Sequence, residues 1–411
     1  MTQTETEGTT RLRDFRLLLT AFVVSTAGDW LYKLALPLLV LQLTGSALQT
    51  AVTYSLEYVP YLFFALIGGV ISDRYDRRTL LIRADAAAAV VMGVLATLVW
   101  LRQEHLWMIY LAALALSTIT PLYQASFQAM LPGTVPKERL GWANSRLQAG
   151  QSTLDLLGPV LGAGAVALVG ASWALSLDAA SFGLSALTVA LIARAATAVA
   201  RQPGGLTIVA DLREAVAFVR ATPTILWGAV IAAGSSLGLS MVEANMIAYL
   251  VHFRHEPVAA VGIVFAALGA GSLVGALLAP KILPHVRPGR LIISSVLVGG
   301  TATALLLLLR PLPLIAATWV LVGASTAVFI VTFFTLRHQL VPAQLLGRVV
   351  VLTRIIAFIT VPIAPLIGGA ILSATGTFLP VIIVAAAAQI GIAVTGRFTP
   401  LWHAQRVGAP D

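Results

Sequence analysis

The sequence predicts an all-α membrane protein of twelve transmembrane helices in two pseudo-symmetric six-helix bundles. Composition is the first reason for this fold class. Of the 411 residues, 58% are hydrophobic and only 10% are charged, whereas soluble globular proteins carry about 25% charged residues. Apolar runs of about 20 residues, each long enough to cross a hydrocarbon core, recur along the whole chain between short polar breaks.

Twelve apolar runs define the expected spans. They are residues 15–43, 48–72, 79–101, 106–131, 142–170, 173–193, 223–251, 258–283, 290–309, 313–336, 349–374 and 377–396. The start MTQTETEGTTRLRDFR is too polar for a cleaved signal peptide, so we expect the first span to remain in the mature protein.

The net charge is +9, and the basic residues are concentrated in every second polar break along the chain. With the N-terminus inside, the inner segments hold 22 of the 26 basic residues, the outer ones only Arg102, Arg254 and Arg310, and Lys33 lies within the first span. The positive-inside rule therefore explains the basicity without a nucleic-acid partner. It predicts a multi-pass protein of the cell inner membrane with both termini in the cytoplasm.

The sequence offers no pattern typical of a cofactor or metal site. Cysteine is absent, and the HFRHE stretch from His252 to Glu256 lacks a recognised ligand spacing. No phosphate-binding loop of the G-x-x-x-x-G-K-[ST] type is present, so nothing supports ATP as the energy source. We expect neither a cofactor nor a metal.

The two halves of the chain contain an internal repeat. Val135 to Gly170 aligns without gaps on Val341 to Gly376 at an offset of 206 residues, and five of the seven identities are glycine or proline. Matched glycines and prolines predict shared backbone geometry. We expect hinges in helices 5 and 11 at Gly158, Pro159, Gly162, Pro365 and Gly368.

The repeat predicts three parts. Residues 1–194 and 223–411 form the six-helix bundles, and residues 195–222 form a cytoplasmic linker that contains a short amphipathic helix. Parallel repeats of this kind place a substrate site between them near the bilayer midplane.

The segment GVISDRYDRR after the second span resembles the signature between helices 2 and 3 of the major facilitator superfamily, which usually has Gly where Asp76 stands. The resemblance implies a conformational latch. In relatives, the acid matching Asp73 sits by the N-terminus of helix 11 in one state, and basic residues tie the loop to its neighbours. The expected latch residues are Gly69, Asp73, Arg74, Arg77 and Arg78.

Other stretches are similar to bacterial exporters of this superfamily that include macrolide-efflux proteins and the enterobactin exporter. They are GDWLYKLALPLLVLQLTGS, LPGTVPKERLGWANS, LDAASF and VPAQLLGRV. GPVLGA, from Gly158 to Ala163, matches only the tail of the helix 5 signature of drug/proton antiporters. The resemblance covers nearly the whole chain and implies export by alternating access.

Six acids fall within the predicted spans, where an ionised Asp costs about 2.5 to 3.5 kcal/mol at the midplane. We expect Asp85 and Asp178, near helix ends, to be structural or solvated. The candidates for proton coupling are Asp29, Lys33, Glu57, Asp155 and Glu243. Asp29 and Lys33 are spaced i, i+4 and have two readings: a structural ion pair, or a carboxylate that takes and releases the coupling proton.

Polar and aromatic stripes at helical spacing predict the wall of a substrate cavity. The stripes comprise Tyr54, Tyr58, Tyr61, Gln124, Gln128, Asn144, Gln148, Gln151, Ser236 and Ser240. An ordinary helix interface with satisfied hydroxyls is the alternative for the tyrosines.

These observations predict a proton-coupled secondary active exporter of small amphipathic compounds that acts as a monomer in the lipid bilayer. The alternatives are a siderophore or lysolipid exporter of the same fold and a receptor-like protein that does not transport. An intramembrane enzyme would need a nucleophile with a base or a metal cluster, and the sequence contains neither pattern.

Overall fold

The computed structural model describes residues 3–193 and 208–404, and within them it leaves out the side chains of residues 3–11, 61–74, 137, 208–212 and 343. Four of the predicted site residues fall among these and lie outside the described side chains. They are Tyr61, Gly69, Asp73 and Arg74.

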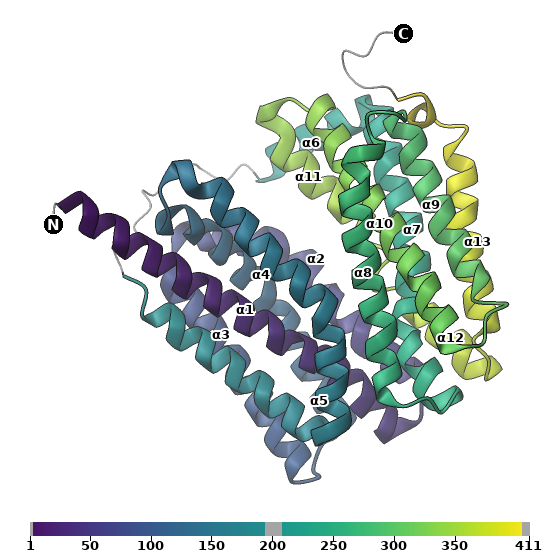
Figure 1. Ribbon diagram of the computed structural model, residues 1–411, viewed down its shortest axis with the longest axis horizontal. Helices are drawn as coiled ribbons and strands as arrows, with labels where there is room; N and C mark the ends of the chain where they lie inside the picture. Colours follow the sequence, from purple (N-terminus) through teal and green to yellow (C-terminus); the bar gives the residue numbers. More distant parts are fainter. Residues whose placement is uncertain (1–2, 194–207, 405–411) are drawn as a thin grey trace. The chain divides into compact units, whose positions relative to one another are not determined.

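The described chain is almost entirely helical (Figure 1). The first helices are α1 (Gln3–Thr44), α2 (Ala47–Arg74), α3 (Arg77–Trp100), α4 (Leu106–Thr134), α5 (Leu140–Ala190) and α6 (Ile208–Ala221). The remaining helices are α7 (Pro223–Ala248), α8 (Val258–Ile282), α9 (Pro288–Leu305), α10 (Leu312–Leu340), α11 (Ala343–Phe358), α12 (Ala364–Thr375) and α13 (Leu379–Gly396). Short 3₁₀ or π turns occupy Lys137–Arg139, Tyr249–Phe253 and Pro400–His403.

Nine helices in the described part of the chain are long and apolar enough to cross a membrane. The difference from twelve predicted spans has three sources. α5 contains two of the predicted spans, which meet at Gly170 with φ 82° and ψ 169°. The span predicted at residues 349–374 consists of α11 and α12, and α2 contains the span predicted at residues 48–72. Every predicted span is therefore largely helical, and the span at residues 349–374 is interrupted between α11 and α12.

The chain divides into two compact units. The first comprises Met1–Gly45, Leu56–Gly204 and Pro257–Gly262, and the second comprises Ser46–Ser55, Gly205–Glu256 and Ile263–Asp411. The start of α2 therefore groups with the second unit and the start of α8 with the first.

Within the first unit, α1 packs along α5 at positions that only glycine fits. A Cβ added to Gly158 would lie 2.2 Å from the Trp30 ring, and one added to Gly162 would lie 2.6 Å from the Trp30 carbonyl oxygen. Close packing of this kind drives helix association in lipid, where burial of apolar surface contributes little. α5 runs without a break through Pro159, so in this structure these glycines serve the α1–α5 contact.

The second unit contains the matching contact. A Cβ on Gly368 of α12 would lie 2.5 Å from Asn245 Nδ2 and 2.8 Å from Met241 Cγ, both on α7. The final glycines of the repeat also match, because Gly170 and Gly376 both have positive φ, 82° and 66°. This conformation suits glycine, so the geometry shared by the two halves explains the shared residue.

The repeat differs at helix 11, which is interrupted between α11 and α12. Pro362 and Pro365 remove two amide donors within four residues, whereas Leu156 occupies the position of the first half that matches Pro362. The interruption is fastened to α7, because the Thr360 hydroxyl donates to the Ala233 carbonyl oxygen at 2.9 Å. Two prolines break this helix where the single Pro159 does not break α5.

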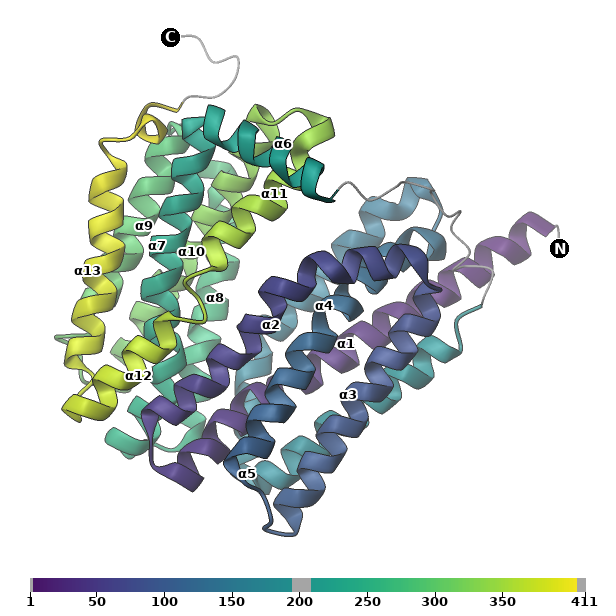
Figure 2. The ribbon, with the colours of Figure 1, turned by 180° about the vertical axis from the view of Figure 1, so that it is seen from behind.

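α6 lies against α11 and the start of α7 (Figure 2). Its buried residues Ala215 and Val219 join a cluster with Ile225 of α7 and Val349 of α11. An ion pair reinforces the contact, with Arg348 Nη1 2.6 Å from Glu214 Oε2.

The loop between α2 and α3 is fixed by its polar residues. Asp76 has φ −62° and ψ 116°, an extended conformation open to any L residue, and its carboxylate caps α3 by accepting from the Thr79 amide at 2.8 Å. Glycine is therefore not needed here. Arg77 donates to the Ala129 carbonyl at 2.8 Å, and Arg78 donates to the Ala190 carbonyl, which ties the start of α3 to α4 and α5.

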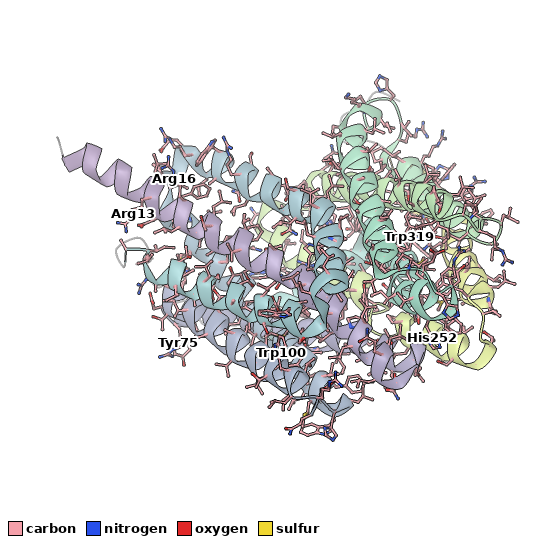
Figure 3. All side chains as sticks on the ribbon, turned by 60° about the horizontal axis from the view of Figure 1, so that its bottom comes forward. Arg13, Arg16, Tyr75, Trp100, His252 and Trp319 are labelled. Carbon is pink, nitrogen blue, oxygen red and sulfur yellow. The ribbon has the colours of Figure 1, made fainter. Side chains whose placement is uncertain are left out.

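Two arginines and a pair of tryptophans lie at different ends of the first unit. Arg13 and Arg16, near the start of α1, lie toward the same end as Tyr75, whereas Trp100 at the end of α3 lies away from them (Figure 3). Trp100 packs edge-on against Trp173, with ring centroids 5.1 Å apart. Paired tryptophans near the end of a span are typical of the boundary between lipid and water.

We predict that Gly162→Ala destabilises the protein, because the added methyl group collides with the backbone of α1. Overpacking at such a contact costs about 1–3 kcal/mol. The measurement is thermal unfolding of the purified variant in detergent.

Gly164→Ala is the matched control on the same helix, since a Cβ there meets nothing within 4 Å. Its melting temperature should equal or exceed that of the unchanged protein. Equal melting temperatures for both variants would contradict the packing role of Gly162.

Candidate functional site

The charged residues of α1 lie where this helix packs on α5. Asp29 and Lys33 are both half-buried. Lys33 Nζ lies 5.1 Å from the centroid of the Trp30 ring, a cation–π geometry, and the same ring fills the space left by Gly158. The α1–α5 contact thus fixes the position of the ammonium group.

Lys33 is the centre of a group of acids within the first unit. Its charge interacts with four carboxylates, which come from three helices: Asp29, Glu57, Asp155 and Asp178. Four of the five predicted coupling residues are therefore brought together. Glu243 lies on α7 and belongs to the second unit.

The polar stripe of α5 forms hydrogen bonds along its own helix. Gln151 Nε2 donates to Asp155 Oδ1 at 2.8 Å, and Gln148 Nε2 donates to Ser152 Oγ at 3.4 Å. Asn144 donates to the Leu140 carbonyl at 3.0 Å. The bond from Gln151 orients the Asp155 carboxylate, so this side chain has a defined place at the edge of the acidic group.

The remaining cavity candidates differ in exposure. Gln124 and Gln128 on α4 are exposed, as are Asn144 and Gln148, whereas Tyr54 and Tyr58 on α2 are half-buried. Ser236 is half-buried, and Ser240 is buried with its hydroxyl donated to the Ser236 carbonyl at 2.7 Å. The hydrogen of the Ser240 hydroxyl is therefore used in a bond within its own helix.

Asp85 and Asp178 are buried, with 1% and 0% of their surface exposed, so of the two expected alternatives, structural or solvated, the solvated one is excluded. Asp85 Oδ2 accepts a hydrogen bond of 2.6 Å from Ser185 Oγ, which fits a structural role. Asp178 Oδ2 has no hydrogen-bond partner. Asp178 interacts with Asp29 and Lys33, which lie on α1. The spacing of residues along α5 alone could therefore not identify Asp178 as part of the site.

Tyr32 is a second residue that the sequence patterns missed. It interacts electrostatically with Glu57, Asp29 and Asp178, which places its phenol among the acids. The signal was its position inside the GDWLYK run, between the two charges.

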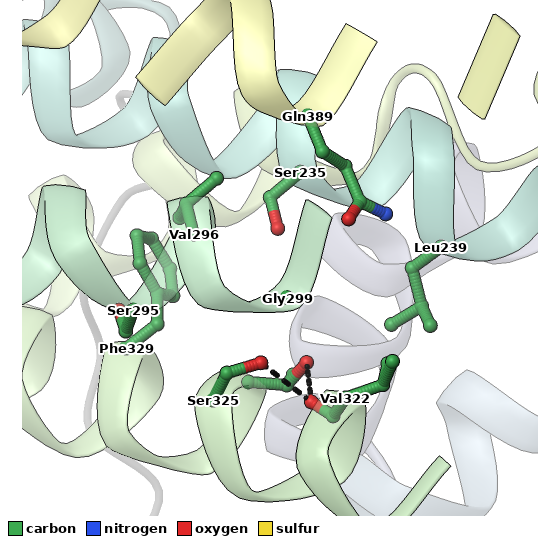
Figure 4. A pocket seen from close by; sticks show the side chains of 10 residues that line it. Ser235, Leu239, Ser295, Val296, Gly299, Val322, Ser325, Phe329 and Gln389 are labelled. Carbon is green, nitrogen blue, oxygen red and sulfur yellow. Dashed lines mark hydrogen bonds between the residues drawn. The ribbon is translucent and has the colours of Figure 1, made fainter. Parts of the chain in front are cut away.

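The second unit contains a separate small pocket with polar lining residues (Figure 4). Ser235 of α7 and Gln389 of α13 face it. The side-chain oxygen Oε1 of Gln389 accepts a hydrogen bond of 3.4 Å from the Thr303 hydroxyl. The other residues that line it are Leu239, Ser295, Val296, Gly299, Val322, Ser325, Thr326 and Phe329. The polar lining is neutral, unlike the acidic group of the first unit.

The described residues include no cluster of three or more His, Cys, Asp or Glu that could hold a metal ion. In the HFRHE stretch, Arg254 Nη2 lies 3.0 Å from Glu256 Oε1, and the guanidinium lies over the Tyr249 ring with its carbon 5.8 Å from the centroid. This pairing accounts for the charged residues of the stretch.

Comparison with known proteins agrees with the fold. The chain matches the model of the Major Facilitator Superfamily over residues 18–359. It is 29% identical over 381 residues to the multidrug efflux pump Tap of Mycobacterium tuberculosis, with 88% of each chain covered. It is 26% identical over 342 residues to the enterobactin exporter EntS of Citrobacter koseri, with 82% of this chain and 79% of the relative covered.

Solved structures show the same fold at lower identity. A mutant of the nucleoside transporter NupG superposes with a TM-score of 0.78 at 14% identity, covering 94% of this chain and 99% of the other. A bacterial homologue of the lysosomal transporter Spinster gives 0.73 at 14% identity, covering 94% and 95%. The chain belongs to the Major Facilitator Superfamily and is a multi-pass membrane transporter, not an enzyme.

Proposed function

We propose that this protein is a proton-coupled secondary active exporter of small amphipathic compounds that works by alternating access. The observation that carries the proposal is the group of four acids around the single ammonium of Lys33 inside the membrane-spanning part of the first unit. The superfamily membership and the exporters among its relatives support the direction of transport.

The charge balance of this group favours proton coupling. Ionised carboxylates away from bulk water need a partner, a cavity or a proton, and Lys33 can neutralise only one of them. The remaining negative charge must be balanced by protons or by a positively charged substrate. A group that can accept either one provides the exchange that a proton-driven exporter requires.

The surroundings of the acids favour lipophilic neutral or cationic substrates. Tyr32 lies among the carboxylates, and Tyr58 is half-buried on the neighbouring α2. Aromatic rings beside carboxylates attract organic cations through both charge and cation–π contacts. The name multidrug efflux pump for Tap is consistent with this substrate class.

Siderophore export is the second candidate function, because the relative EntS is an enterobactin exporter. Lysolipid export by the same fold is a further alternative. The group of acids argues against a polyanionic siderophore as the substrate, because carboxylates repel a negatively charged ligand. A receptor-like protein would bind without transport. A substrate screen in proteoliposomes with an imposed proton gradient separates these functions, because only an exporter moves the compound uphill.

We predict that changing Asp29→Asn and Lys33→Met together abolishes uphill efflux while substrate still binds and moves downhill. The single change Asp29→Asn would alter the balance between Lys33 and the acids around it, so its effect on folding and its effect on coupling could not be separated. The double variant removes both charges and should be expressed normally. Transport is measured in proteoliposomes with and without a pH gradient.

Retention of uphill, proton-driven efflux by the double variant would make Asp29 and Lys33 a structural pair. The coupling proton would then belong to Glu57, Asp155 or Glu243.

The orientation of the chain is part of the proposal: an inner-membrane protein with cytoplasmic termini, acting as a monomer. Because the native chain has no cysteine, single cysteines report cleanly on each side. Cysteines at Gln103 and Thr377 should react with an impermeant maleimide in intact cells, and one at Tyr75 only after permeabilisation. All three positions are exposed, so lack of access to the reagent reflects the membrane. Labelling of position 75 in intact cells would overturn this orientation.

For the latch we predict that Asp73→Asn slows transport at nearly normal expression, because it weakens one conformational state and leaves the substrate cavity intact. Turnover is measured at saturating substrate. Asp76→Asn serves as the comparison, since the Asp76 carboxylate caps α3 and the amide oxygen of Asn can still accept that hydrogen bond. Unchanged turnover in Asp73→Asn, with normal binding, would remove the latch from the mechanism.

A further inference from the structure

The Asp178 carboxyl group has almost no partners. None of its surface is exposed. Oδ1 lies 3.5 Å from Ser181 Oγ, but that hydroxyl has only one hydrogen and lies 2.8 Å from the Asp178 carbonyl oxygen. Oδ2 has no hydrogen-bond partner. An ionised carboxylate in this place would lack the hydrogen bonds that make buried charge tolerable.

Asp85, in the same unit, is a buried acid whose carboxylate accepts a hydrogen bond. It is also buried, yet its Oδ2 accepts a short bond of 2.6 Å from Ser185. Both acids belong to the first unit, and each has a serine of α5 near its carboxyl group. The difference is that Ser185 points its hydroxyl at Asp85, whereas Ser181 turns its hydroxyl to the backbone of its own helix.

Gly28 brings α1 directly onto the Asp178 side chain. A Cβ added to Gly28 would lie 2.0 Å from Ser181 Oγ and 2.6 Å from Asp178 Oδ1. The next residue of α1 is Asp29, which is half-buried, so the two carboxyl groups belong to touching segments. One of them is partly exposed and the other is fully enclosed.

The charges that act on Asp178 come mainly from α1. The Asp178 carboxyl group interacts electrostatically with Asp29 and Lys33, and also with the phenol of Tyr32. On α3, which also packs on α5, the acid is Asp85, on which the charge of Asp29 acts. The single ammonium of Lys33 cannot compensate Asp29 and Asp178 when both are ionised.

We propose that Asp29 and Asp178 share one exchangeable proton, with Lys33 as the fixed counter-charge, and that release of this proton creates the negative charge that a monovalent organic cation occupies. The proposal rests on the proton-coupled export proposed above. With the proton on Asp178, the ionised Asp29 and Lys33 cancel. When the proton moves from Asp178 Oδ2 to Asp29 and leaves to water, the summed charge of Asp29, Asp178 and Lys33 changes from 0 to −1. Glu57 and Asp155, the other two acids near Lys33, do not change charge in this step.

The arrangement gives each acid a distinct task. Asp29, being partly exposed, exchanges the proton with water, whereas Asp178 is enclosed and stores it. Because the charge of the cation equals that of the departing proton, the total charge of the site is the same in both forms. This equality makes the exchange of a proton for a cation electrostatically inexpensive.

The test uses the full-length protein and the lipophilic cation tetraphenylphosphonium. In weakly buffered detergent solution, the unchanged protein should release a proton as the cation binds, which a pH indicator detects. Asp178→Asn replaces the carboxyl group by an amide of nearly the same shape that holds no exchangeable proton. This variant should bind the cation without proton release, and in proteoliposomes it should lose uphill efflux but keep downhill movement.

Asp85→Asn is the matched control, because it removes a buried acid of the same unit that already has a hydrogen-bond donor. It should keep proton release and uphill efflux. Proton release and uphill efflux retained in Asp178→Asn would overturn the shared proton. If the unchanged protein couples no proton to efflux at all, the proposed function fails as well, so the two failures are distinguishable.

Infrared difference spectroscopy of the unchanged protein covers the case in which Asp178→Asn does not fold. With ¹³C-carboxyl-labelled aspartate, cation binding should remove the C=O band of a protonated aspartic acid. A spectrum in which no aspartic acid loses its proton would overturn the proposal without any variant.

Discussion

The close contact between α1 and α5 is the constraint on which the candidate site depends. In lipid, burial of apolar surface contributes little free energy to the association of two helices. Helices therefore associate where small residues let their backbones approach closely. Gly158 and Gly162 accept Trp30 on one part of α5, and Gly28 of α1 accepts Asp178 and Ser181 on another. The charged residues of α1 are therefore held against α5 by packing, without a direct bond between the charges.

This packing explains how a lysine and several acids are tolerated in the same apolar bundle. Lys33 gains its cation–π contact from the ring that fills the glycine site, and its charge acts on acids from three helices. An arrangement with more acids than bases is stable only if protons occupy some carboxyl groups. The same imbalance that makes the bundle costly gives it a means of responding to protons.

The two units use one packing scheme with different outcomes. Gly162 meets α1 and the matching Gly368 meets α7, so each unit joins its first and fifth helices through a glycine of the repeat. The second unit adds Pro362, where helix 11 is interrupted, and it contains a pocket lined by neutral polar and apolar residues. The shared geometry supports the fold, and the proposed proton coupling rests on the acids of the first unit.

The sequence by itself determined the fold class, because the need to span about 30 Å of hydrocarbon and to satisfy every backbone group fixes both the length and the helical form of each apolar run. It also identified Asp29, Lys33, Glu57 and Asp155 as costly residues inside the membrane, since charge in an apolar run is visible one residue at a time. Only the tertiary structure decided which acids share an environment. Asp85 and Asp178 looked alike near their helix ends, yet Ser185 donates to one, and Gly28 of a distant helix encloses the other. Contacts between helices depend on how they are rotated against each other, and the spacing along a single helix carries no record of that rotation.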